Sequence, residues 1–266
     1  RKRTSAPFGV NFLIPFVDRA AVEVAVDGAR VAEFFYGPPD PSLVDLAHQG
    51  GALACWQVGS RDEARKAADA GCDLIVAQGV EAGGHVRGQT GLLALLELVL
   101  ESVEVPVLAA GGIGSARAVA GVLAAGAAGA RVGTRFLAAE EADVHDRYLE
   151  ALIAAEADDT VLTTTFSNMW PDAPHRVLRR SMEAALALDE DVVAEIELPG
   201  GERMGVPRLA PPSPVRGAVG HLEAMPHYAG QSVGYVTGRM SAAAIVQELA
   251  DGAEALLARR SVQPAT

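Results

Sequence analysis

The sequence predicts an α/β fold built on a parallel sheet, and three observations support this prediction. Six short apolar runs lack strict alternation with polar residues, and a helical stretch separates each run from the next. The repeat is roughly 20–30 residues long, as expected for a β/α unit. Half of the residues are hydrophobic, which is ample for a large core. These features indicate either a (β/α) barrel or an open doubly wound sheet.

The predicted elements follow one another regularly through the first half of the chain. The strands lie within residues 8–15, 30–36, 52–58, 72–77, 105–110 and 130–137. The helices lie within residues 19–28, 41–50, 60–71, 91–103 and 116–125. Residues 1–7 are polar and are expected to form a loop or a helix end. Ser60 and Glu63 have the spacing of a capping box, and Ser115 is expected to cap the last of these helices.

The regular pattern ends near residue 140. A helix is expected at 143–155, an added strand at 160–166, and a strong amphipathic helix at 241–259. Prolines and arginines are scattered through 168–226 without a clear period, which indicates an elaborated lid. We therefore expect a single domain with barrel units in 1–140, an elaboration or lid in 141–240, and a packing helix in 241–259. The side chains expected to face inward from that helix are Ile245, Val246, Leu249, Leu256 and Leu257.

Composition excludes several classes of function. The net charge of −12 disfavours binding to nucleic acid or to an anionic membrane surface. No apolar run is long enough to span a membrane, and no signal peptide is evident. Cys55 and Cys72 lack the spacing of a metal site or a disulfide framework, so we expect buried thiols in a reducing, cytoplasmic setting.

The stretch 76–85 has the layout of an active site at the end of a strand. A wholly apolar run leads into a loop that carries Gln78, Glu81, Gly83, Gly84 and His85. Glycine lets backbone N–H groups approach a ligand closely, because no Cβ intervenes. An imidazole exchanges a proton near neutral pH. The alternative is a flexible turn with an exposed histidine.

Two further glycine turns end the last two predicted strands. They are Gly111-Gly-Ile-Gly114 and Gly133-Thr134, and the helix expected to begin at Ser115 lies between them. In barrels, the loops after the final strands often hold a phosphate through backbone N–H groups and a helix N-terminus. We therefore expect a cofactor that carries a phosphate. Asn11, inside an apolar run, is expected to be buried and to pair either with backbone or with a ligand.

The stretches 76–85, 109–113 and 133–136 closely resemble the nitronate monooxygenase family, which consists of FMN-dependent TIM-barrel enzymes. The resemblance extends from residues 7–11 to residues 228–234. It implies that His85 removes the proton next to the nitro group of the substrate. It also implies that FMN contacts Asn11, Gln78, Gly83, Gly112, Arg131, Val132, Gly133 and Thr134. The implied substrates are O₂ and a small nitro compound, such as propionate 3-nitronate or a nitroalkane.

The chain departs from the family in two places. A (β/α)₈ barrel has eight strands, whereas six are found here. We therefore expect that the first two units, roughly 60 residues at 20–30 residues each, are missing. Such an open sheet would leave hydrophobic edges, so self-association into a homo-oligomer is an expectation. The stretch 168–180 also differs from the family pattern and bears on the substrate pocket.

Other functions compete with this interpretation. A related group of FMN-dependent enoyl-thioester reductases shares the glycine-histidine loop and the phosphate turns. A barrel remnant without a cofactor is a non-catalytic alternative. A barrel resembling inosinate dehydrogenase is disfavoured, because His85 stands where that group offers a cysteine. Among the remaining residues His145 is expected on a solvated helix face, and His175, His221, His227 and Tyr228 are candidates for the pocket.

Overall fold

The computed structural model describes residues 4–198 and 200–261, so residues 1–3 of the expected N-terminal loop lie outside it. The described chain forms two compact units. Unit 1 comprises the stretch up to Val80 together with Arg87–Ala110 and Val122–Arg131. Unit 2 comprises Glu81–Val86, Gly111–Gly121 and the chain from Val132 onward. Each unit is described by itself, and the division at residue 140 that the sequence suggested stays a prediction.

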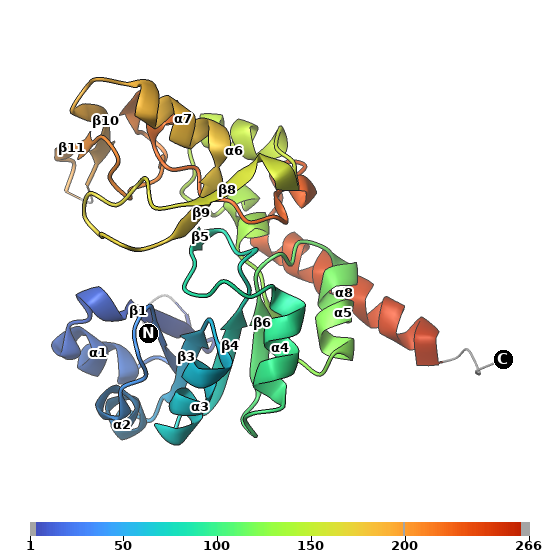
Figure 1. The fold of residues 1–266 in the computed structure, drawn as a ribbon. Helices are drawn as coiled ribbons and strands as arrows, with labels where there is room; N and C mark the ends of the chain where they lie inside the picture. The colour runs from blue at the N-terminus through green and yellow to red at the C-terminus, as the bar shows by residue number, and fades with distance from the viewer. Residues whose placement is uncertain (1–3, 199, 262–266) are drawn as a thin grey trace. The chain divides into compact units, whose positions relative to one another are not determined.

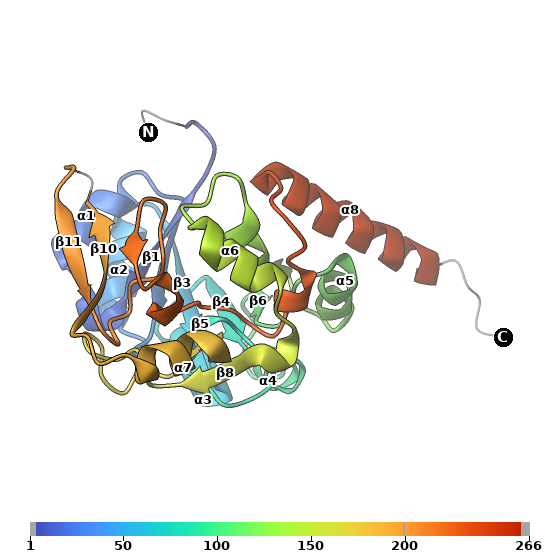
Figure 2. The same ribbon diagram turned by 90° about the horizontal axis from the view of Figure 1, so that it is seen from above.

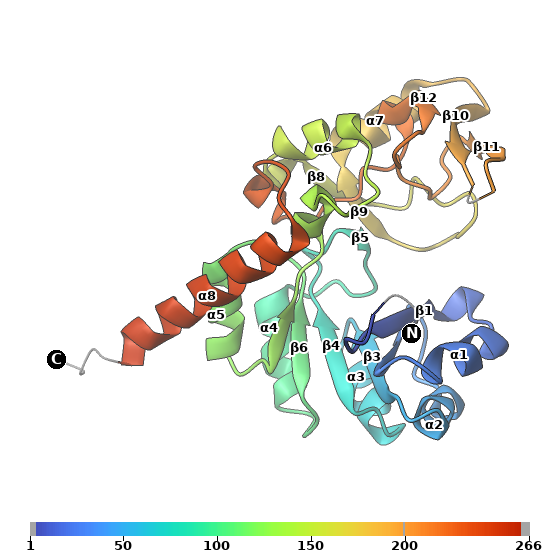
Figure 3. The same ribbon diagram turned by 180° about the vertical axis from the view of Figure 1, so that it is seen from behind.

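Unit 1 is built on one six-stranded sheet in which all neighbouring strands are parallel (Figures 1 and 3). The strand order is β1-β2-β3-β4-β6-β7. The order therefore follows the chain, as expected for consecutive β/α units. The strands are β1 (Gly9–Leu13), β2 (Val31–Phe35), β3 (Leu53–Val58), β4 (Leu74–Gln78), β6 (Val107–Ala110) and β7 (Gly129–Arg131).

A helix joins each pair of neighbouring strands in this sheet, at positions close to those predicted. The helices are α1 (Arg19–Val26), α2 (Pro41–Gln49), α3 (Arg61–Asp69), α4 (Leu92–Leu100) and α5 (Ala116–Ala124). Ser60 caps α3 by accepting from the Glu63 N–H. The second half of the predicted capping box is wrong, because the Glu63 carboxylate accepts from the Gly59 N–H at 2.9 Å and pairs with Arg87.

One face of the sheet has a core of its own. Buried Cys55, Val76 and Ala110 pack with Val31, Leu74 and Leu108, and all six residues come from β2, β3, β4 and β6. Both thiols are buried and free, as predicted. Burial raises the pKa of the Cys72 thiol to about 12 and raises that of Cys55 further. Both thiols are therefore protonated at neutral pH.

The sheet is strongly curled, and a side-chain contact on the same face demonstrates it. Arg131, on the edge strand β7, hydrogen bonds to Gln57 on β3 at 2.7 Å and pairs with Glu33 on β2. Four strand spacings separate β7 from β2, or about 19 Å across a flat sheet. An arginine and a glutamate together reach well short of that distance. The sheet must therefore bend toward this face, as the wall of a barrel does.

Unit 2 contains two small antiparallel sheets and three longer helices (Figure 1). One sheet has the order β5-β9-β8 and the other has the order β11-β10-β12. The strands are β5 (Gly84–His85), β8 (Thr160–Thr163), β9 (His175–Leu178), β10 (Val192–Glu197), β11 (Arg203–Pro207) and β12 (Val219–Gly220). The helices are α6 (Asp146–Ile153), α7 (Arg179–Ala187) and α8 (Ala242–Ser261). Short 3₁₀ helices are η1 (Ile14–Phe16), η2 (Thr134–Ala138), η3 (Ala157–Asp159), η4 (Leu222–Ala224) and η5 (Val233–Tyr235).

Three predictions were wrong: where one strand ends, which elements lie in 168–226, and which way Val246 faces. The last predicted strand stops at Arg131, and η2 begins after Gly133. The stretch 168–226 was expected to be irregular but contains β9, α7 and the second small sheet. Its strands are only two to six residues long, too short to give a periodic signal. In α8, which runs as one long helix (Figure 2), Ile245 and Leu249 are buried as expected, whereas Val246 is 54% exposed.

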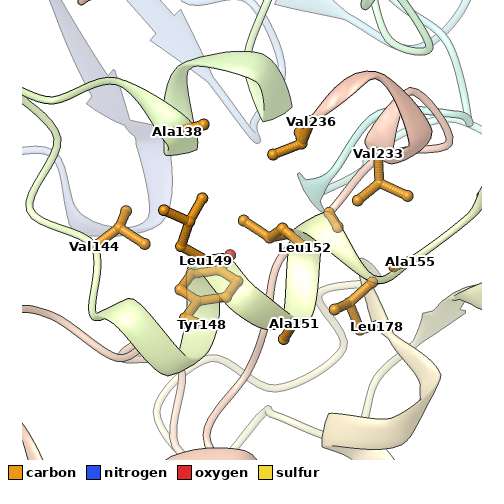
Figure 4. Packing of buried hydrophobic residues seen from close by; sticks show 11 residues of the cluster. Ala138, Val144, Tyr148, Leu149, Ala151, Leu152, Ala155, Leu178, Val233 and Val236 are labelled. Atoms are coloured by element: carbon orange, nitrogen blue, oxygen red, sulfur yellow. The ribbon is translucent and has the colours of Figure 1, made fainter. Parts of the chain in front are cut away.

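The core around α6 holds part of unit 2 together. Tyr148, Leu149 and Leu152 point from this helix toward Val233 and Val236 (Figure 4). A second cluster joins α8 to the segment after β7, with Ile245 and Leu249 packed against Ala139 and partly buried neighbours. None of the helices in the described part of the chain has the length and apolar character needed to cross a membrane.

Two neighbouring residues of α6 provide a test of this core. Leu152 is fully buried, whereas Ile153 is 43% exposed. We expect Leu152→Ala to lower the free energy of unfolding by about 3 kcal/mol, because it leaves a cavity. Ile153→Ala should cost less than about 1 kcal/mol. Urea denaturation of both variants checks the difference, and equal losses would contradict this packing.

Candidate active site

His85 occupies a fixed position at an edge of a small sheet in unit 2. It lies in β5, which pairs antiparallel with β9, so that Gly84 is opposite Arg176 and His85 is opposite His175. The next residue continues the pairing, because the Val86 N–H donates to the Pro174 carbonyl at 2.8 Å. The alternative of a flexible turn with an exposed histidine is therefore wrong, since β pairing orders the backbone here.

Aromatic rings surround the His85 imidazole. The Trp170 ring stacks on it, with centroids 4.0 Å apart and planes inclined by 26°. The centroids of His175 and Tyr228 lie 5.4 Å and 5.9 Å from the same imidazole. Burial, and to a smaller extent His175, lowers the pKa of His85 from 6.5 to about 4. The ring is therefore neutral at neutral pH, which is the form that accepts a proton.

His175 serves as a structural brace. It is fully buried, its Nδ1 lies 2.9 Å from the Ala173 carbonyl, and its Nε2 accepts from the Phe166 N–H at 3.2 Å. A carbonyl only accepts, so the proton sits on Nδ1 and the ring is neutral. Burial accordingly lowers its pKa. The ring ties together the two ends of the loop that carries Trp170.

The glycine loop of unit 2 lies directly against the turn at Ala229-Gly230. A Cβ on Gly83 would lie 2.4 Å from the Gly230 nitrogen, so only glycine fits without a shift of backbone. The Gly230 N–H donates to Thr134 Oγ1 at 3.0 Å, and the Gln231 N–H donates to the Glu81 carbonyl at 2.9 Å. These contacts join the His85 loop to the turn at Thr134.

The two predicted phosphate turns join the same network. Gly112 has φ +68°, and a Cβ there would lie 3.2 Å from the Cβ of Glu81. Gly133 has open space where its Cβ would be. The following Arg135 fixes η2 through the Tyr235 carbonyl at 2.6 Å and Glu248 at 2.8 Å. Val132 directs its side chain into the α8 core, so only its backbone can face a ligand.

The predicted site residues of unit 1 share the curled face of the sheet. The Asn11 amide donates to Glu33 at 2.8 Å, and Arg131 pairs with the same carboxylate. The expectation that Asn11 is buried is wrong: it is exposed, and its amide pairs with the Glu33 side chain and not with backbone. Gln78, at the end of β4, is 5% exposed and accepts from the Arg87 N–H at 3.4 Å.

The remaining histidines have other tasks. His145 caps α6 through Nδ1 and does not sit on a solvated helix face. His221 lies near Glu190 and Glu223 at the surface. His227 is buried, and its ring stacks on Tyr148 at 4.6 Å. Its Nε2 is 3.1 Å from the Leu222 carbonyl, so the proton sits on that nitrogen.

Sequence reasoning missed several residues that build these two groups. Trp170, Glu33, Gln57 and Gly230 were not singled out. Trp170 is one of only two tryptophans in a chain poor in aromatic residues, and it lies in a stretch already known to depart from the family pattern. A rare tryptophan inside this departing stretch was the signal that could have identified Trp170. Glu33 and Gln57 could have been found only from the register of neighbouring strands.

Unit 1 is a curled parallel sheet of β/α units, and unit 2 holds an ordered imidazole beside glycine turns. Residues 2–252 match the nitronate monooxygenase family. The chain belongs to that family, and the predicted fold class, a (β/α)₈ barrel represented by six consecutive units, is confirmed.

Similar proteins include curated relatives and solved structures. The chain is 38% identical over 184 residues to (3aS,4S,5R,7aS)-5-hydroxy-7a-methyl-1-oxo-octahydro-1H-indene-4-carboxyl-CoA dehydrogenase of Mycobacterium tuberculosis, covering 67% of this chain and 50% of the relative. It is 36% identical to the putative monooxygenase Rv1533 of that organism, covering 71% and 54%. The chain thus spans about half the length of these relatives.

Two solved structures match nearly the whole chain. FabK from Thermotoga maritima has a TM-score of 0.75 and 26% identity, covering 98% of this chain and 80% of that one. Nitroalkane oxidase from Streptomyces ansochromogenes has a TM-score of 0.70 and 29% identity, covering 95% and 83%.

His227 makes the stability of unit 2 depend on pH. Burial lowers its pKa to about 4, below the value of about 6.5 in the unfolded chain. The unfolded state therefore binds the proton first as pH falls, and stability present above pH 6.5 is lost toward pH 4. Between pH 7.5 and 5 we expect the wild type to lose about 2 kcal/mol more than His227→Phe. Urea denaturation at both pH values checks this, and parallel losses would contradict it.

Proposed function

We propose that the protein is an FMN-dependent nitronate monooxygenase in which His85 is the catalytic base. The observation that carries this proposal is a neutral, half-buried imidazole held by β pairing next to the glycine turns. The proton next to a nitro group is acidic, and its removal leaves a nitronate anion. A base with a lowered pKa is in the correct form to accept that proton, and it returns the proton to water easily.

The residues present fit a flavin phosphate. In unit 2, the open side of Gly133 leaves room for a ligand at the backbone. Thr134 Oγ1 accepts from Gly230, so its own hydroxyl proton remains available to donate. In unit 1, Asn11, Gln78 and Arg131 offer polar groups from one sheet face. We keep the flavin-binding roles of Gly83, Gly112, the Val132 backbone and these residues as part of the proposal.

Bound FMN would take electrons from the nitronate and pass them to O₂. The chain's own residues have the other tasks. His85 takes the proton, and the aromatic rings around it keep water from competing for the base. Small-molecule substrates, O₂, a cytoplasmic location and self-association all stay predictions. The buried free thiols Cys55 and Cys72 support a reducing compartment.

A second candidate is flavin-dependent chemistry on an acyl thioester. The 38% identical relative is named a carboxyl-CoA dehydrogenase, which supports it. The carbon next to a thioester carbonyl also carries an acidic proton, so the same base would serve. Oxygen uptake with propionate 3-nitronate or a nitroalkane supports the first function. Anaerobic turnover of an acyl or enoyl thioester with NAD(P)H or an electron acceptor would support the second. A protein that stays colourless with added FMN would favour the non-catalytic remnant.

His85→Ala separates deprotonation from oxidation. We expect the variant to retain bound flavin and to lose at least about a hundredfold in kcat/KM for neutral nitroalkanes. Preformed nitronates need no base and should react with much smaller losses. Stopped-flow flavin reduction with both substrate forms measures the split. Similar losses for both forms would remove His85 from the role of base.

Glycine-to-alanine variants test the phosphate turn. Gly133→Ala puts a Cβ into open space, so we expect unchanged stability but about tenfold weaker FMN binding, from contact with the phosphate. Gly121→Ala, on α5, also meets nothing within 4 Å and is the matched control. Gly83→Ala should disturb both folding and binding. Fluorescence titration with FMN gives the affinities, and equal affinities for the Gly133 and Gly121 variants would exclude the Gly133 role.

A further inference from the structure

The loop between β8 and β9, residues 164–174, is anchored along its length in unit 2. The Asn168 side chain donates to the Arg208 carbonyl, and its backbone N–H donates to the Leu209 carbonyl at 3.2 Å. Leu209 has φ +63°, an unfavourable value for a leucine that the surrounding contacts must maintain. The Trp170 N–H donates to the Ser167 carbonyl at 3.0 Å. With the His175 ring tying both ends, this loop is a fixed wall.

Trp170 projects inward from this wall. It is 8% exposed, whereas the adjacent Met169 is 62% exposed. Its indole covers one face of the His85 imidazole, as the 4.0 Å stacking distance requires. The two planes are inclined by only 26°, so the indole holds the orientation of the imidazole plane. Trp170 therefore restricts how the His85 ring can turn and keeps this face of the ring covered.

We propose that Trp170 is a positioning residue: it fixes the plane of the His85 ring and shields one face of that ring from water. This inference rests on the proposed role of His85 as the base. The stack itself is a contact of the type worth about 0.5–1.5 kcal/mol beyond buried area.

The His85 pKa can report on the role of Trp170, because the other groups around His85 are known. His175 on β9 is neutral and fixed, and Tyr228 presents a phenol whose pKa is raised by burial. Arg176 on β9 lies opposite Gly84 in the strand pairing, and the charge of Glu81 acts on it. Burial is the larger cause of the lowered His85 pKa. Removing the indole admits water and should raise that pKa. Removing the indole also removes its attraction for the imidazolium form, and this effect would lower the pKa of His85.

The first experiment needs neither flavin nor turnover. The His85 pKa is measured by NMR titration in flavin-free wild type, Trp170→Ala, Trp170→Phe and the exposed control Met169→Ala. We expect Trp170→Ala to raise the pKa by about one unit or more toward 6.5, with a smaller rise for Phe. Met169→Ala should leave it unchanged. An unchanged or lowered pKa in Trp170→Ala would overturn the positioning role. Phe keeps a ring in the wall and provides the test if Ala does not fold.

The second experiment separates deprotonation from oxidation. The ratio of kcat/KM for nitroethane to that for its preformed nitronate is compared between wild type and the Trp170 variants. We expect Trp170→Ala to lower this ratio about tenfold, because only the neutral substrate needs a well-oriented base. An unchanged ratio would overturn the positioning role. A raised pKa together with no nitroalkane turnover by wild type would support the positioning role and reject the proposed function alone.

Discussion

The contact between Gly83 and Gly230 is the constraint on which the arrangement of unit 2 depends. Two backbones approach so closely that any side chain at Gly83 would meet main-chain atoms. The approach places the Gly230 N–H on Thr134 and the Gln231 N–H on the Glu81 carbonyl. Three segments far apart in the chain are thereby brought into one network. A strand-end loop that would otherwise be mobile becomes a rigid support for His85.

Desolvation then gives the imidazole its chemical character. Burial away from water disfavours the charged form of a titratable group. Accordingly, burial lowers the pKa values of His85, His175 and His227. His85 lies in the glycine loop, stacked on Trp170, whereas His175 and His227 are almost fully buried beside backbone carbonyls. The same physical effect therefore yields one candidate base and two structural histidines. Local partners, and not the residue type, decide which is which.

Much of unit 1 could be predicted from sequence because its order is local. Most strands are apolar runs, and α1, α2 and α3 each have a side-chain N-cap, so the six parallel strands and their helices were expected close to where they lie. Strand ends were less predictable: β7 stops at Arg131, and η2 begins at Thr134. The glycine motifs and His85 were found because backbone approach and proton exchange restrict residue type.

The rest could not be predicted because it depends on contacts between distant residues. Trp170 and His85 are 85 positions apart, and Glu33 meets Arg131 only because the sheet curls. Asn11 was expected to be buried but is exposed, and its partner Glu33 is set by the register of β1 with β2, which no local pattern encodes. Short strands such as β12 have two residues and leave no period to detect.

The two cysteines of unit 1 have a consequence for the proposed chemistry. Peroxide and related by-products of oxygen-consuming enzymes attack thiolates far faster than thiols. Cys55 and Cys72 are held as neutral S–H groups, because burial places their ionisation far above physiological pH. Their sulfur atoms are therefore poor targets for oxidation. A catalyst that handles O₂ at every turnover would thus carry no easily damaged thiol at these two positions.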